Sequence, residues 1–176
     1  MGIFHIIIQS FLFLANINRF VEHYLTGSTQ PFPFHKFPTV EALAATVLKK
    51  FSPRSLSSAA HLGTGGETIP VEACYQNEFY QVLQTVLGFS SKVISEWSGG
   101  GDCRIDFMVK DSGWGIELLR EGERLGEHCQ RFVGNGKYTP LIRDGSIRDW
   151  LIIDCRTSQP CPYSESTSNL AYSFCC

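Results

Sequence analysis

Two carboxylates interrupt apolar runs that otherwise have the composition of β-strands. Asp106 lies in the run at residues 104–109, and Glu117 lies in the run at residues 114–119, eleven positions further along the chain. Strand side chains alternate between faces, so pairing the apolar sides of the two runs places both acids on the opposite face. Adjacent carboxylates repel each other unless a cation joins them, and their hard oxygen atoms suit Mg²⁺ or Mn²⁺.

The same pattern has an ordinary alternative. Acids on the wet face of a hairpin are commonly solvated, and Arg104 or Arg120 lies close enough in sequence to neutralise them. Motif spacing as loose as this also arises by chance. The residue pattern alone therefore leaves a metal site and a solvated face both open.

The alternation assigns every residue of the two runs to a face. Residues 110–113 between them read as a short hairpin connection. In the second run, Ile116 and Leu118 share the apolar face, and Glu117 and Leu119 share the other. In the first run, the apolar face takes Cys103, Ile105, Phe107 and Val109, and the other face takes Arg104, Asp106 and Met108.

A helix predicted over residues 70–87 contributes further acids. Its apolar stripe consists of Val71, Tyr75, Phe79, Val82 and Val86. By the same geometry Glu78 lies on the rim of the stripe. Glu72 lies closer to the stripe, but an acid in the first helical turn is well explained by the helix dipole.

Periodic patterns predict the other elements and their order. A helix over 39–51 has Thr39 as its N-cap, and a helix over 121–132 has a stripe of Leu125, Cys129 and Phe132. The run at 149–154 is almost continuously apolar, as in a strand covered on both faces. With a strand at 91–97, the order helix, strand, strand, strand, helix, strand predicts an α/β or α+β fold, in which helices flank a mixed sheet.

The chain is long enough for one domain. It has 176 residues, of which 43% are hydrophobic and 18% are charged, and its net charge is −2. This balance gives no general attraction to nucleic acid, so such binding would need a local basic patch. The seven cysteines form no C-x-x-C pair, which argues against a zinc site.

The N-terminal apolar stretch at residues 3–15 is interrupted by His5, Gln9 and Ser10. It is too short and too polar for a membrane span, and it lacks the basic start and the small-residue cleavage site of a secretion signal. We interpret it as a helical extension or an imperfect leader. The expected organisation is an apolar segment and proline-rich connector at 1–38, a helix and Ser/Gly-rich linker at 39–68, the α/β domain at 69–160 and an irregular tail at 161–176.

Several stretches, taken in order, resemble the nuclease-like C-terminal domains of fungal Crinkler-type (CRN) proteins, and more broadly the PD-(D/E)XK restriction-endonuclease-like superfamily. The resemblance covers residues 37 to 160 and implies an αβββαβ core for the domain at 69–160. Each stretch is weak alone, and the set is specific. The stretches are residues 72–80, 96–101, 104–107, 114–120, 124–132, 136–138 and 147–154.

The resemblance implies roles for individual residues. Asp106 and Glu117 would hold Mg²⁺ or Mn²⁺, and Glu78 would be the assisting acid of the first helix. The superfamily places a lysine two residues after the hairpin glutamate, but this chain has Leu119 there. Water activation would then fall to the metal, or the domain would be inactive.

Cationic residues complete the predicted site. Arg120 or Arg124 would balance charge in the transition state. Arg124, Arg131 and Lys137 are the candidates for contact with a nucleic-acid backbone, although a solvated helix face also explains the two arginines of the helix at 121–132. His128, on the border of the apolar stripe in that helix, is interpreted as a packed histidine.

The predicted function is metal-dependent hydrolysis of nucleic acid, DNA above all. The alternative is a non-catalytic effector module that keeps the fold and binds nucleic acid or a host protein, and Leu119 favours it. The family resemblance implies secretion and action in a host nucleus, although the N-terminus is a weak export signal.

Overall fold

The computed structural model of the chain describes residues 31–58, 72–88, 91–100 and 103–157, together with the backbone of residues 172–175. The predictions for residues 1–30, for most of the linker and for residues 161–171 lie outside this part of the chain. Among the described residues, no helix combines the length and apolar character needed to cross a membrane.

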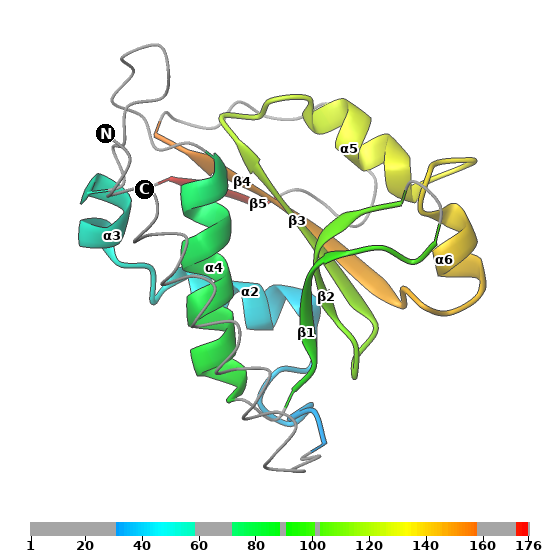
Figure 1. Cartoon of the computed structure of the whole chain (residues 1–176), viewed down its shortest axis with the longest axis horizontal. Helices are drawn as coiled ribbons and strands as arrows, with labels where there is room; N and C mark the ends of the chain where they lie inside the picture. The colour runs from blue at the N-terminus through cyan, green and yellow to red at the C-terminus, as the bar shows by residue number, and fades with distance from the viewer. Residues whose placement is uncertain (1–30, 59–71, 89–90, 101–102, 158–171, 176) are drawn as a thin grey trace, which may run out of the picture.

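A five-stranded mixed sheet forms the centre of the molecule (Figure 1). The strands lie side by side in chain order, with β1, β2 and β3 antiparallel and with β3, β4 and β5 parallel. The predicted mixed sheet is confirmed at this level. The strands are β1 (Val93–Trp97), β2 (Ile105–Val109), β3 (Trp114–Arg120), β4 (Asp149–Arg156) and β5 (Tyr172–Cys175).

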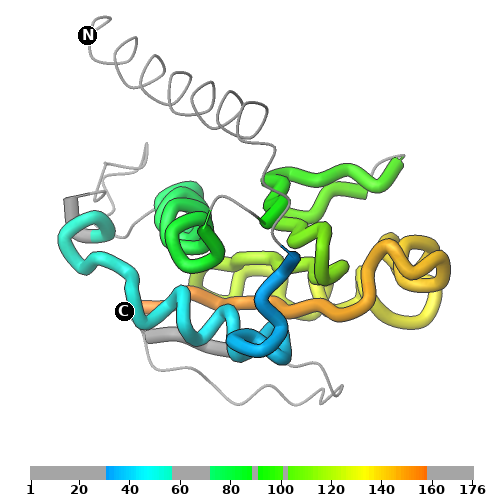
Figure 2. The backbone as a smooth tube through the Cα atoms, turned by 90° about the horizontal axis from the view of Figure 1, so that it is seen from below, coloured from blue at the N-terminus to red at the C-terminus, as the bar shows by residue number. Residues whose placement is uncertain are grey.

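Helices pack on both faces of this sheet, and each face has its own apolar core. In Figure 2, α5 and α6 lie together, away from α2 and α4. Helices α2 and α4 pack on one face, called here the α4 side, and α5 and α6 pack on the other, the α5 side. Strand β4 contributes alternate residues to both cores, which explains its almost continuous apolar sequence. The helices are α2 (Val40–Leu48), α3 (Pro53–Ser58), α4 (Glu72–Leu87), α5 (Leu125–Phe132) and α6 (Thr139–Arg143).

The longer elements form where periodicity and capping residues predicted them, except that α5 begins at Leu125 and not at Glu121, because residues 121–124 form turns and Arg124 has the left-handed φ of +57°. Thr39 Oγ1 accepts a hydrogen bond from Ala42 N–H over 3.3 Å at the start of α2. Gly88 follows α4 with φ +65°, a conformation that glycine adopts without strain. The sequence did not predict the short elements α3, α6 and β5. Strand β5 lies in the segment that was predicted to be an irregular tail. These three elements have 6, 5 and 4 residues, which is too short for a periodic pattern.

The predicted assignment of the first hairpin run to faces is wrong at its start. Phe107 and Val109 pack on the α4 side as expected, but Ile105 packs on the α5 side. In the neighbouring strand, Glu96 has the left-handed φ of +50°, immediately before the pair formed by Trp97 and Ile105. The pairing register is continuous across this point, so the left-handed backbone at Glu96, and not an inserted residue, interrupts the regular alternation of faces.

Candidate functional site

Glu117 is the centre of a buried polar cluster on the α5 side of β3. Its side chain is 1% exposed. Tyr138 OH donates to Oε1 over 2.6 Å, and His128 Nδ1 lies 2.5 Å from Oε2. Arg131 Nη1 lies 3.5 Å from Oε1 and 3.4 Å from Oε2. These three partners offset the cost of removing a carboxylate from water.

The three partners of Glu117 come from α5 and the segment that follows it. His128 and Arg131 lie one turn apart on α5, so both face the same side. Tyr138 N–H donates to Arg131 O over 2.7 Å, and its ring packs edge-on against Phe132 with the ring centroids 4.8 Å apart. The predicted apolar stripe of α5, to which Phe132 belongs, is confirmed and holds this helix against the sheet.

The turn from β3 into α5 fixes the helix relative to the sheet. Asp154 is fully buried in β4, accepts a hydrogen bond from Gly122 N–H over 2.6 Å, and forms an ion pair with Arg156. Glu121 Oε1 accepts hydrogen bonds from both the N–H and the hydroxyl of Thr157, each over 2.7 Å. These contacts connect the start of α5 to the end of β4, and they explain why an acid lies inside the β4 core.

Asp106 joins the cluster from β2. Its Oδ2 accepts a hydrogen bond from Leu118 N–H over 2.9 Å. Burial raises the pKa of Asp106 to about 6, the Leu118 hydrogen bond lowers it, and the negative charges of Glu117 and Glu72 raise it again. The two acids selected from the sequence are therefore electrostatic neighbours.

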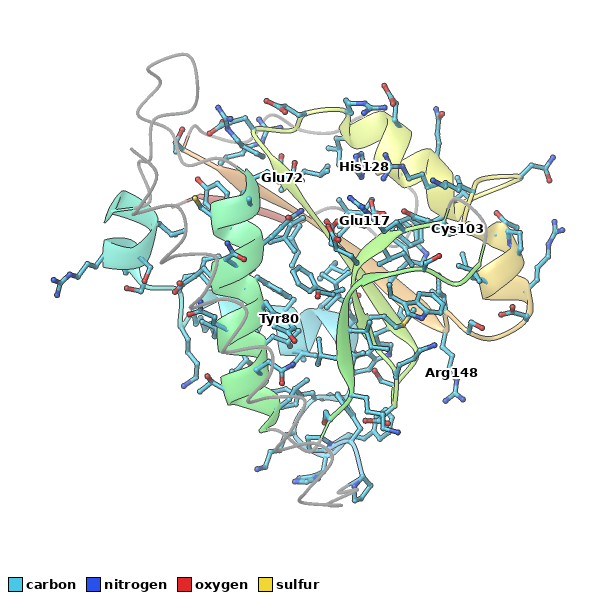
Figure 3. The ribbon with its side chains drawn as sticks, viewed as in Figure 1. Glu72, Tyr80, Cys103, Glu117, His128 and Arg148 are labelled. Carbon is cyan, nitrogen blue, oxygen red and sulfur yellow. The ribbon has the colours of Figure 1, made fainter. Side chains whose placement is uncertain are left out.

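Glu72, in the first turn of α4, is the helix acid whose charge acts on the cluster, while its carboxylate accepts a hydrogen bond from Gln76 of the same helix. Burial raises the pKa of Glu72, His128 lowers it, and Glu123 and Glu117 raise it. Figure 3 shows Glu72, Glu117 and His128 directed toward the same region between α4 and α5. Together with Asp106, Arg131 and Tyr138, these residues form what we call the Glu117 cluster.

Glu78 does not belong to this cluster, because it makes a different contact. It is 9% exposed, and its Oε1 accepts a hydrogen bond from Ser52 N–H, just before α3, over 2.7 Å. Six residues of α-helix rise about 9 Å and turn well away from the starting face, so Glu72 and Glu78 point in different directions. The buried residues of α4 also include Leu83 and Leu87 on the other side of the stripe, so the buried face is wider than the stripe predicted by sequence.

The Glu78→Gln variant is expected to lose about 1 kcal/mol in the free energy of unfolding, because a neutral amide accepts the Ser52 hydrogen bond more weakly than a carboxylate does. Urea denaturation measures the loss. Glu123→Gln, at an exposed position, is the matched control and should change stability by less than about 0.5 kcal/mol. Equal stability of the two variants would contradict this role of Glu78.

The residues predicted to contact nucleic acid differ in their surroundings. Arg131 is 27% exposed and is directed toward Glu117. Arg124 is exposed and pairs with Glu127 over 2.5 Å. Lys137 is exposed in the segment between α5 and α6. Only Arg124 and Lys137 therefore present their side chains to solvent, and Arg131 instead helps to neutralise the cluster.

The position of the expected lysine is apolar in structure as well as in sequence. Leu119 is 2% exposed and belongs to the core on the α5 side. Arg120, the next residue, is partly buried at the end of β3, and its charge lowers the pKa of Glu72. A positive charge thus lies near Glu72 at the end of β3.

The donor atoms of the cluster decide which residues fit a metal ion. The described residues contain no group of three His, Cys, Asp or Glu side chains placed to hold one. Both oxygens of Glu117 already have partners, so Asp106 and Glu117 do not fit a shared cation as arranged. Asp106 and Glu72 each use a single oxygen in hydrogen bonds among the described residues. Mg²⁺ commonly takes one or two carboxylates and completes its shell with water and phosphate oxygens, and each of these two side chains keeps one carboxylate oxygen that could serve as such a ligand.

Sequence reasoning left three members of the cluster without a role. Tyr138 lies outside any periodic pattern, although it belongs to a stretch that carries the family resemblance. Glu72 was explained by the helix dipole and His128 as a packed histidine. The available signal was that His128 and Arg131 lie one turn apart beside the apolar stripe of α5, facing the strand that carries Glu117.

Comparison of the chain with protein-family models, with curated proteins and with solved structures found no match. The resemblance to Crinkler-type and restriction-endonuclease-like domains therefore remains a prediction from the motif set. The contacts of the chain's own residues carry the functional interpretation.

Proposed function

We propose that this chain is a nuclease-like domain that hydrolyses phosphodiester bonds of nucleic acid, DNA above all, and that its core is restriction-endonuclease-like and similar to Crinkler-type domains. The order α4, β1, β2, β3, α5, β4 supports this, because it is the order that the motif set implies. A fold does not confer an activity, so the proposal depends on the site.

The observation that carries the proposal is the convergence of acids from three separate elements. Asp106 Oδ2 of β2 accepts a hydrogen bond from Leu118 N–H of β3, the residue next to the buried Glu117. Burial and the charges of Glu117 and Glu72 raise the pKa of Asp106, and burial and the charge of Glu117 raise the pKa of Glu72. A core would be at least as stable with apolar residues at these positions, so the arrangement is typical of a functional site.

Mg²⁺ or Mn²⁺ is the proposed cofactor, and Asp106 and Glu72 would hold it. When bound, such an ion supplies positive charge to a phosphate and lowers the pKa of a bound water. Arg120 would balance charge beside Glu72. Arg124 and Lys137 would contact phosphates of the nucleic-acid backbone, which is the usual role of exposed basic side chains.

Plasmid cleavage tests this function. The purified chain is incubated with supercoiled DNA in Mg²⁺, in Mn²⁺ or in EDTA, and we expect cleavage with either cation and none in EDTA. Asp106→Asn and Glu72→Gln should cut about 100-fold more slowly, because each removes a charged oxygen donor. Asp111→Asn, at an exposed position outside the cluster, should cut like the wild-type chain.

Two results would contradict the proposed site. Equal cutting by the wild-type chain and by both cluster variants would indicate another site or a contaminating enzyme. Intact plasmid in every lane, with folded protein, would mean that the chain does not hydrolyse DNA under conditions that supply the cation.

The second candidate function is a non-catalytic module that binds nucleic acid or a host protein. The burial of Leu119 at the lysine position favours it, because this residue offers no donor for water activation. Fluorescence anisotropy with a labelled oligonucleotide tests nucleic-acid binding. Binding that persists in EDTA and weakens with salt, without any cleavage, would support this second function over the first.

A further inference from the structure

His128 and Glu117 form a hydrogen-bonded pair in which one partner is buried and the other reaches solvent. The side chain of Glu117 is 1% exposed, that of His128 is 16% exposed, and 2.5 Å separate Oε2 from Nδ1. We infer that His128 Nε2 accepts the proton of the water that attacks the phosphodiester, with Glu117 as the residue that positions the imidazole. This inference rests on the proposed hydrolysis and adds to it the residue that activates water.

The contacts of Nδ1 decide where the imidazole carries its hydrogen. A lone pair of Nδ1 facing a carboxylate oxygen at 2.5 Å would be strongly repelled, so Nδ1 carries the hydrogen and donates it to Glu117. Arg131 Nη1 lies further away, 3.1 Å from Nδ1, and it has no acceptor atom. A neutral imidazole with hydrogen on Nδ1 has its free lone pair on Nε2.

Nε2 is available for chemistry. Among the described residues, the polar contacts of His128 are all made through Nδ1 or the backbone. The imidazole is partly exposed, so Nε2 is left to water or to a substrate. A buried carboxylate that orients a histidine through Nδ1, and leaves Nε2 as the base, is the arrangement that hydrolases use to activate a nucleophile.

The charges around His128 come from every element that packs against it. Glu117 of β3, Asp106 of β2 and Glu72 of α4 favour the positive charge that the imidazole gains, as does Glu127 on its own helix. Arg131 opposes it from the next turn of α5.

The step balances without any further reactant. Water gives a proton to Nε2 while its oxygen forms a bond to phosphorus. The bond from phosphorus to the leaving oxygen breaks, and this oxygen takes a proton from solvent. His128 then returns its proton to solvent and regains the neutral form. In this way His128 supplies the proton acceptor that Leu119 cannot provide.

Chemical rescue tests the inference in the full chain. His128→Ala should cleave plasmid DNA about 100-fold more slowly in kcat, with little change in KM. Added imidazole should restore its rate by about tenfold or more, while Asp106→Asn should not respond to imidazole. His128→Gln provides a second variant if the alanine variant does not fold. Gln130→Ala, exposed on the same helix, is the control and should keep the wild-type rate.

The nitrogen-15 resonances of the histidine ring give a readout that does not need activity. In the wild-type chain at pH 8, His128 should carry its hydrogen on Nδ1, and Glu117→Gln should abolish this preference. Hydrogen on Nε2 instead of Nδ1 would overturn the inference. It would also be overturned if the wild-type chain cleaves DNA and folded His128→Ala or His128→Gln cleaves it at the same rate. An inactive wild-type chain in which Nδ1 carries the hydrogen would instead refute the proposed hydrolysis, and the catalytic role of His128 with it.

Discussion

Glu117→Ala is expected to reduce the free energy of unfolding by about 3 kcal/mol. Removing one partner of a buried charged pair costs about 3–5 kcal/mol, since the remaining groups keep their desolvation cost and lose their acceptor. Arg131, His128 and Tyr138 would all lose the same carboxylate. The lower end of the range applies because Arg131 is 27% exposed and can turn toward water.

Urea denaturation at pH 7 measures this loss, and two milder variants calibrate it. Tyr138→Phe removes a single hydroxyl and should cost about 1 kcal/mol. In the Glu117→Ala background, Tyr138→Phe should cost less than it does alone, because Glu117 Oε1 is already absent and only Arg104 O remains as an acceptor for the hydroxyl. Full additivity of the two substitutions would contradict the central place of Glu117 in the cluster.

Asp106→Asn is expected to act in the opposite direction on stability and to abolish most activity. An asparagine oxygen can still accept the hydrogen bond from Leu118 N–H, and it carries no charge to desolvate. We expect a gain of about 1–2 kcal/mol in the free energy of unfolding at pH 7–8. Cleavage should be about 100-fold slower, as described for the plasmid assay.

The pH dependence of this gain follows from the direction of the shift. The pKa of Asp106 is about 6 in the folded chain, against the ordinary value of 3.8. Below pH 3.8 the Asp106 carboxyl is protonated in both the folded and the unfolded chain, so it does not lower the free energy of unfolding. As the pH rises from 3.8 to about 6, Asp106 ionises in the unfolded chain before it ionises in the folded chain. The wild-type chain therefore loses stability until the pH passes the folded pKa.

Urea denaturation of both chains between pH 4 and 8 checks the linkage. The advantage of Asp106→Asn over the wild-type chain should be small near pH 4, grow toward pH 6 and stay constant above it. Asp111→Asn, at an exposed position outside the cluster, is the control for other titrating groups. A constant difference across this range would show that the two states share one pKa at Asp106.

The two variants separate the roles of acids that the sequence had paired. Glu117 has donors on both oxygens, so its loss should mainly destabilise the fold and disturb His128. Asp106 is held by a single backbone hydrogen bond and is destabilising when ionised. Natural proteins keep such destabilising groups where function requires them.

The sequence by itself determined the longer elements, their order and the proximity of Asp106 and Glu117. Alternation in strands and the helical period depend on backbone geometry alone, so they can be read along the chain. The caps of the helices depend on single residues such as Thr39 and Gly88. Even so, Ile105 packs on the α5 side, next to the left-handed backbone of Glu96 in the neighbouring strand, which alternation did not predict.

Only the tertiary structure decided which side chains meet Glu117. Periodicity describes how a residue is placed around its own helix or strand, but not how that element is rotated and shifted against its neighbours. The packing of α4 brings Glu72 to the cluster and places Glu78 beside Ser52. The packing of α5 turns His128 and Arg131 inward. Short elements such as α6 and β5 were likewise decided by long-range contacts, since they hold too few residues for a local signal.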